Sequence, residues 1–152
     1  MICLNVQEFL KHKDEIENVL LEEFRPDIMG FTETHVTNVV EDHELEIEGY
    51  VCVRGDSESS RTGGVLLYVD KSIKFEIKAI DRCERNWWTI TVKISNEHYR
   101  GSLMLVYHSP SGSDASFLDF LEEMCNNDLL NGNVIIMGDF NIDMKIKNYR
   151  IS

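Results

Sequence analysis

Apolar residues recur along the chain at spacings typical of helices and of strands. Helical spacing predicts an amphipathic helix over about residues 8–25, which Pro26 ends. Its predicted apolar face consists of Leu10, Ile16, Val19, Leu20 and Phe24. A second helix is predicted after the loop 109–113, with Ser113 or Asp114 as N-cap. Its predicted apolar face consists of Phe117, Leu118, Leu121 and Cys125.

Shorter apolar runs between turn residues predict strands. Two strand-and-helix units surround a β-rich middle, and this order predicts an α/β (α+β) fold, a mixed sheet with helices on its outer face. The predicted strands are residues 1–6, 27–34, 50–54, 63–69, 73–77, 87–94, 100–107 and 134–137.

The length of 152 residues corresponds to one domain, predicted over 1–152. The longest apolar runs, Val65–Val69 and Leu103–Tyr107, are far shorter than the roughly 20 residues that span a membrane, so no membrane partner is expected. The N-terminus lacks the basic start and long apolar stretch of a signal peptide. We therefore expect an intracellular protein, nuclear or cytoplasmic.

The formal net charge of −12 argues against non-specific nucleic-acid binding, which depends on neutralising phosphates. Residues 1–50 hold 3 basic and 13 acidic residues, whereas residues 51–152 hold 12 basic and 14 acidic residues. A polyanion should therefore meet the later segments first. The four cysteines are dispersed without C-x-x-C spacing, which favours free thiols over zinc or redox pairs.

Polar side chains follow the ends of several predicted strands, where α/β proteins usually place their sites. These residues are Asn5, Glu33, Tyr107, Asp139 and Asn141. Asp139 and Asn141 would point the same way from an extended segment, where they could orient a water and hold a phosphate oxygen. A turn capped by Asp and Asn explains the pair as well. Glu33 is either a divalent-metal ligand or a capping residue.

Other residues have an ordinary alternative reading. Arg61, in Arg-Thr-Gly-Gly, could touch a phosphate, but a hairpin turn explains this stretch as well. Trp87 and Trp88 should lie on opposite faces of a strand, and core packing is favoured over base stacking.

Taken together, these residues match one family in order and spacing. Their contexts are Leu-Asn-Val, Phe-Thr-Glu-Thr-His, Val-Tyr-His-Ser-Pro and Gly-Asp-Phe-Asn-Ile-Asp. The chain resembles the endonuclease/exonuclease/phosphatase superfamily, and more closely the endonuclease domain of LINE-type non-LTR retrotransposons. The closer match rests on Pro-Asp-Ile-Met-Gly-Phe-Thr-Glu-Thr-His, Arg-Thr-Gly-Gly-Val-Leu-Leu-Tyr-Val and Val-Ile-Ile-Met-Gly-Asp-Phe-Asn-Ile-Asp.

The resemblance implies a Mg²⁺-dependent DNA-nicking enzyme, with Mn²⁺ as the alternative ion. Glu33 would bind the metal with Asn5 beside it, and Tyr107 would orient the scissile phosphate. The resemblance further implies that Asp139 aligns the attacking water and that Asn141 holds the phosphate. These oxygen ligands suit Mg²⁺.

The resemblance also assigns a role to His108. Retrotransposon relatives often carry Arg at that position, which makes His108, with Arg61, a candidate for substrate contact. A further departure is Gln7, where nucleases of abasic sites often carry an acid.

The implied fold is an incomplete two-sheet α/β sandwich, truncated at its C-terminal side. The chain ends 11 residues after Asn141, without the family's Ser-Asp-His segment. We therefore expect one sheet to lack its packing partner, a marginal fold, and self-association through the uncovered face. Three functions remain open: a DNA-nicking domain impaired by truncation, a phosphatase of the same superfamily, and an inactive remnant or interaction module.

Overall fold

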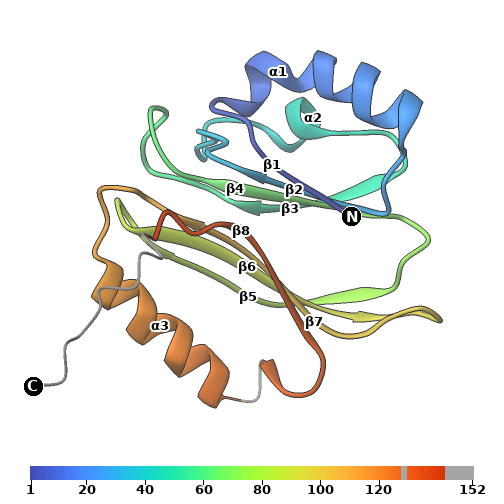
Figure 1. The fold of residues 1–152 in the computed structure, drawn as a ribbon. Helices are drawn as coiled ribbons and strands as arrows, with labels where there is room; N and C mark the ends of the chain where they lie inside the picture. The colour runs from blue at the N-terminus through green and yellow to red at the C-terminus, as the bar shows by residue number, and fades with distance from the viewer. Residues whose placement is uncertain (128–129, 143–152) are drawn as a thin grey trace, which may run out of the picture.

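The computed structural model describes residues 1–127 and 130–142, and these form two facing β-sheets with helices on their outer faces (Figure 1). The two sheets are four-stranded, in the orders β1-β2-β4-β3 and β5-β6-β7-β8. This arrangement confirms the predicted two-sheet α/β sandwich. The predicted tail, 144–152, lies outside the described residues.

The first sheet combines a parallel edge with a hairpin. Its strands are β1 (Ile2–Asn5), β2 (Ile28–Thr32), β3 (Tyr50–Gly55) and β4 (Val65–Asp70). β1 runs parallel to β2, while β4 is antiparallel to both β2 and β3. β2 is buried along its whole length, because it is a central strand between two packed layers.

The second sheet has the same mixture of pairings. Its strands are β5 (Phe75–Cys83), β6 (Trp87–Ser95), β7 (Arg100–His108) and β8 (Val134–Asp139). The pairs β5–β6 and β6–β7 are antiparallel, and β7 is parallel to β8. The connection from β7 to β8 contains α3 (Asp114–Asn126), which covers the outer face. Ser113 caps α3 by accepting a hydrogen bond from the Ser116 backbone N–H, as predicted.

Three apolar layers hold the molecule together. The middle layer lies between the sheets and includes Leu67, Ile90 and Leu105. Gly30 of β2 lets the sheets approach, since a Cβ there would come within 2.8 Å of Leu105 Cδ1. The Trp87 ring stacks on Phe120 of α3, whereas Trp88 lies in the middle layer, so the two indoles occupy opposite faces as predicted.

The predicted helix over 8–25 is partly wrong in its apolar face. It is formed by α1 (Phe9–Ile16) and a π-helical segment, η1 (Glu17–Leu21). The wider π turn rotates the later residues out of phase with the first turns. Val19 and Phe24, which follow the start of this turn, are 47% and 65% exposed. Leu10, in α1 itself, is 40% exposed, so it is not part of the buried face either.

A short helix, α2 (Asp42–Leu45), lies in the acidic connection between β2 and β3, where no regular element was predicted. The side chains of Glu41 and Glu44 form a reciprocal capping box around its first turn. This helix lies over the outer face of the first sheet, where Leu45 and Ile47 are buried against Tyr50 and Tyr68.

The expected sheet without a packing partner is not found in the described part of the chain. Apolar residues of β2, β3 and β4 pack directly on those of β6 and β7. Missing C-terminal residues were expected to leave one sheet without its partner, but strands β2, β3 and β4 of the first sheet already pack on β6 and β7 of the second. Self-association was expected because one sheet face would be uncovered, and the two sheets instead cover each other. The truncation itself stays a prediction.

Candidate active site

The predicted site residues gather at one end of the sandwich because of strand direction. β1 is parallel to β2 and β7 is parallel to β8, so in each sheet two carboxyl ends lie together. Asn5 ends β1, Glu33 follows β2, and Asp139 ends β8 opposite Tyr107 of β7. The sheets thus contribute two polar residues each.

A hydrogen bond links the two sheets at this end. The Tyr107 hydroxyl donates to Glu33 Oε1 across 2.8 Å. Burial, and then the carboxylate of Glu33, raise the pKa of Tyr107 well above its usual range, so its hydroxyl stays protonated at neutral pH. Glu33 has the left-handed backbone conformation, with φ at 52°, as the chain turns away from β2. This turn places the carboxylate at the strand end.

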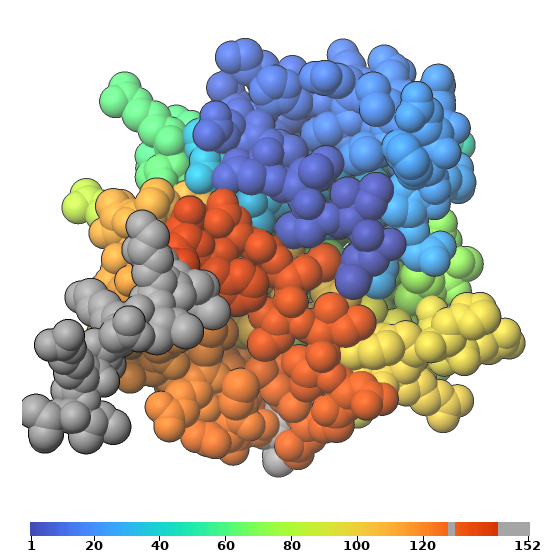
Figure 2. Space-filling view, in the orientation of Figure 1, coloured from blue at the N-terminus to red at the C-terminus, as the bar shows by residue number. Residues whose placement is uncertain are grey.

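A second hydrogen bond joins the beginning of the chain to its last described strand. Asn5 Nδ2 donates to Asp139 Oδ2 across 3.1 Å. The two edge strands that carry these residues meet on the face seen in Figure 2, where the N-terminal segment borders the β8 segment. Burial and the charge of Asp139 raise the pKa of the nearby Cys3 thiol.

Of the two geometries considered for Asp139 and Asn141, the structure has the capped turn and not the extended segment. The φ of Asn141, 43°, is left-handed, so its side chain does not share one direction with that of Asp139. Its backbone N–H donates to Asp139 Oδ1 across 3.3 Å, and its Nδ2 donates to the His108 carbonyl across 2.8 Å. The segment 139–141 is therefore a capped turn that also faces the site.

The two predicted substrate contacts have contrasting positions. The His108 side chain is fully buried and stacks on Phe117, with ring centroids 4.5 Å apart. Its ring therefore faces the protein interior in this arrangement. Arg61 is exposed in the loop between β3 and β4. That loop is tied beside Glu33, because the backbone N–H of Thr34 and that of His35 donate to the carbonyls of Gly64 and Gly63.

Gly138 is a site-building residue whose role sequence analysis missed. Its φ is 144°, and a Cβ there would lie 1.8 Å from the Val106 carbonyl oxygen. Glycine thus lets the main chain of β8 approach β7 immediately before Asp139. The only signal in the sequence is its place in the stretch Gly-Asp-Phe-Asn.

The donor atoms at this end of the sandwich fit a hard divalent ion. Glu33 offers a carboxylate, and Asn5 uses its amide nitrogen on Asp139, which leaves its amide oxygen for a metal. In the described parts of the chain no group of three or more His, Cys, Asp or Glu side chains is placed to hold a metal. The ion would therefore keep several waters, as Mg²⁺ commonly does.

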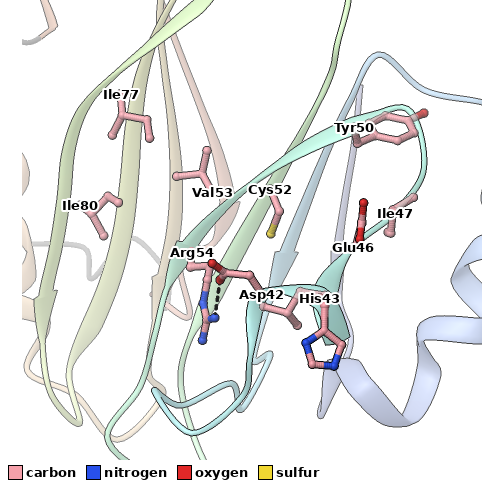
Figure 3. Close-up of a pocket in the computed structure, with 11 residues that line it drawn as sticks. Asp42, His43, Glu46, Ile47, Tyr50, Cys52, Val53, Arg54, Ile77 and Ile80 are labelled. Carbon is pink, nitrogen blue, oxygen red and sulfur yellow. Dashed lines mark hydrogen bonds and ion pairs between the residues drawn. The ribbon is translucent and has the colours of Figure 1, made fainter.

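A separate hollow of about 560 Å³ lies at the other edge of the sandwich, between α2, β3 and β5 (Figure 3). Arg54 is a cation within it, but Asp42 and Asp56 both bind its guanidinium, at 2.7 and 2.9 Å. Their carboxylates neutralise the charge that a phosphate would need. None of the seven predicted site residues lines this hollow.

Two facing mixed sheets, helices outside, and a polar constellation at the strand ends define an α/β-sandwich of the DNase-like class. The model of the Endonuclease/Exonuclease/phosphatase family matches residues 3–147, and this chain belongs to that family. No curated protein sequence matches the chain significantly.

Solved structures share the fold. The catalytic domain of Xenopus laevis APE2 has a TM-score of 0.65 and 19% identity, over 93% of this chain and 58% of that one. The 3′ phosphatase NExo from Neisseria, bound to a product DNA hairpin, has a TM-score of 0.62 and 22% identity, over 93% of this chain and 57% of that one. A Bacteroides thetaiotaomicron mannosyl-6-phosphatase has a TM-score of 0.61 and 15% identity, over 97% of this chain and 67% of that one. The chain thus spans about three fifths of the first two structures.

No helix in the described part of the chain is long and apolar enough to cross a membrane.

Proposed function

We propose that this chain is a divalent-metal-dependent phosphodiesterase domain that nicks DNA, of the type found in non-LTR retrotransposons. The observation that carries the proposal is the meeting of four polar residues at one end of the two sheets. Tyr107 and Asn5 hold the carboxylates of Glu33 and Asp139 through hydrogen bonds of 2.8 and 3.1 Å. The retrotransposon assignment is supported by the three sequence stretches that resemble that family.

The chain's own residues divide the work. Glu33 and Asn5 supply oxygen ligands for Mg²⁺ or Mn²⁺, and enzymes of this family are generally divalent-metal dependent. When bound, such an ion polarises the phosphate and stabilises the leaving oxygen. Asp139 orients the attacking water, because N–H donors on both of its oxygens hold the carboxylate in place.

Two further residues hold the substrate. Tyr107 keeps its proton, so its hydroxyl, which donates to Glu33 in this structure, would turn its one hydrogen to a phosphate oxygen when substrate binds. The amide of Asn141 has two hydrogens, of which the His108 carbonyl takes one, so the second can be donated to the phosphate. Arg61, exposed in the loop beside Glu33, contacts the DNA backbone outside the scissile bond. The nuclear or cytoplasmic location expected from the sequence is compatible with a DNA substrate.

A phosphomonoesterase is the second candidate, and the charge favours it. A net charge of −12 repels a long polyanion, whereas a small phosphate ester needs no extended basic surface. The choice between the two depends on the substrate, since the same constellation serves both reactions.

A nicking assay tests the proposal. Supercoiled plasmid should be nicked with Mg²⁺ or Mn²⁺ and not with EDTA, and Glu33→Gln or Asp139→Asn should lower the rate by roughly 100-fold or more. The matched control is Glu48→Gln, an exposed carboxylate of the acidic connection, which should retain the wild-type rate. Nicking that survives both site substitutions contradicts the assigned roles. Inositol phosphate hydrolysed in preference to plasmid selects the phosphatase.

A further inference from the structure

The buried ring of His108 lies directly behind the candidate site. Its Nδ1 is 2.9 Å from the Phe140 carbonyl oxygen. A carbonyl only accepts hydrogen bonds, so Nδ1 must carry the hydrogen and donate it. His108 thereby contacts the turn that connects Asp139 to Asn141 without facing solvent itself.

The peptide bond between Phe140 and Asn141 is held at both ends. Its carbonyl accepts from His108 Nδ1, and its N–H donates to Asp139 Oδ1 across 3.3 Å. A peptide unit is planar, so its carbonyl and N–H turn together. The orientation of the His108 ring therefore fixes the direction from which the N–H meets the carboxylate of Asp139.

The ring is itself rigidly placed. Its plane lies at 6° to that of Phe117 of α3, with centroids 4.5 Å apart. The main chain of His108 adds a second restraint, because its carbonyl accepts from Asn141 Nδ2 across 2.8 Å. His108 thus fixes the peptide between Phe140 and Asn141 with its ring. It fixes the side-chain amide of Asn141 with its backbone carbonyl.

We propose that His108 is a positioning residue, which orients the carboxylate of Asp139 and the amide of Asn141 through the peptide bond that it holds. The inference rests on the proposed function for its kinetic consequence. It assigns His108 an indirect role in place of the substrate contact expected from the sequence. Helix α3, which carries Phe117, becomes part of the support of the site.

Two substitutions separate the ring's shape from its hydrogen bond. His108→Phe keeps a planar ring to stack on Phe117 but removes the donor to the Phe140 carbonyl. His108→Asn loses the stacking but keeps a nitrogen on Cγ, at the place of Nδ1. The matched controls are His98→Phe and His98→Asn, at an exposed histidine between β6 and β7, at the opposite end of the sandwich.

Backbone hydrogen exchange measures the positioning without any need for activity. The backbone N–H of Asn141 should be protected from exchange in the wild type. Its protection factor should fall at least 10-fold in His108→Phe and recover in part in His108→Asn. Unchanged protection in a folded His108→Phe variant overturns the inference. If that variant unfolds, the imidazole ¹⁵N spectrum of the wild type decides, because a hydrogen on Nε2 with a bare Nδ1 also overturns it.

Plasmid nicking supplies the kinetic arm. His108→Phe should lower kcat by about 10- to 100-fold with KM nearly unchanged, and His108→Asn should restore part of kcat. A folded His108→Phe variant with wild-type kcat overturns the inference. A wild type that turns over no substrate instead contradicts the proposed function, and the exchange experiment still tests the positioning of Asn141.

Discussion

Asn5 and Asp139 stand 134 positions apart in the sequence, and a hydrogen bond of 3.1 Å joins their side chains. The bond connects the first strand of one sheet to the last described strand of the other. It requires unlike partners, an amide that donates and a carboxylate that accepts.

Changing Asn5 to Asp should therefore place two carboxylates in contact. Repulsion and the lost hydrogen bond should lower the free energy of unfolding by about 1–2 kcal/mol without divalent ions. Mg²⁺ or Mn²⁺ should then stabilise the variant more than the wild type. Thermal unfolding with and without the ion measures both effects. Asn38→Asp, an exposed loop position, is the control and should show neither; equal ion effects in all three proteins would contradict a metal site at Asn5.

Tyr107 should make stability depend on alkaline pH. Its folded-state pKa is raised by burial and by Glu33, so its contribution is fully present below the unfolded pKa of about 10 and is lost as pH rises toward the folded value. Tyr107→Phe should cost about 1–3 kcal/mol at pH 7, through the lost hydrogen bond to the carboxylate. This difference from the wild type should shrink above pH 10. Urea unfolding across this range measures it, and a difference that is constant with pH contradicts it.

Gly138 should tolerate no side chain. Gly138→Ala would put a Cβ 1.8 Å from the Val106 carbonyl oxygen, and the displaced strand should cost at least about 3 kcal/mol. Gly132→Ala is the control, since Gly132 also has a positive φ, of 83°, but its Cβ would meet nothing within 4 Å. It should cost only about 1 kcal/mol, from backbone strain. Equal losses in denaturant unfolding would attribute the effect to φ alone.

The thiols should differ in reactivity. Burial raises the pKa of Cys52 to about 11, whereas Cys125 is exposed on α3. The thiolate is the reactive form, so at pH 8 a disulfide reagent such as DTNB should modify Cys125 first and Cys52 slowly. Cys125→Ser should remove the fast phase. A fast phase that persists in Cys125→Ser and disappears in Cys52→Ser would contradict this order.

The central strands of the sheets were predictable from sequence because their apolar runs are short, bounded by turn residues and largely buried. Val65–Asp70 and Trp87–Ser95 begin within two residues of the predicted strands. The π-helical segment after α1 was not predictable, since the helical spacing of its apolar residues does not distinguish a π turn from an α turn. α2 was missed because glutamate is an unusual N-cap, although Glu41 and Glu44 have the spacing of a capping box.

The site was predictable in its membership but only partly in its geometry. Strand ends and family resemblance identified Glu33, Tyr107 and Asp139, which the fold brings together. For Asn141 the sequence left open both an extended segment and a turn capped by Asp and Asn, and the positive φ matches the turn. No sequence pattern indicated that His108 would be buried on Phe117, because that contact depends on α3 packing against β7 in the assembled domain.

The hydrogen bond from Tyr107 to Glu33 spans the gap between the layers, so its length depends on the thickness of the sandwich. That thickness is set at Gly30, where Leu105 of the facing sheet fills the space of a missing side chain. An added methyl group would meet the ends of the Leu105 and Met137 side chains, at 2.8 and 2.9 Å, so these two side chains would have to shift between the layers. Under the proposed function, a change at Gly30 would then reach the site without altering any of its polar residues.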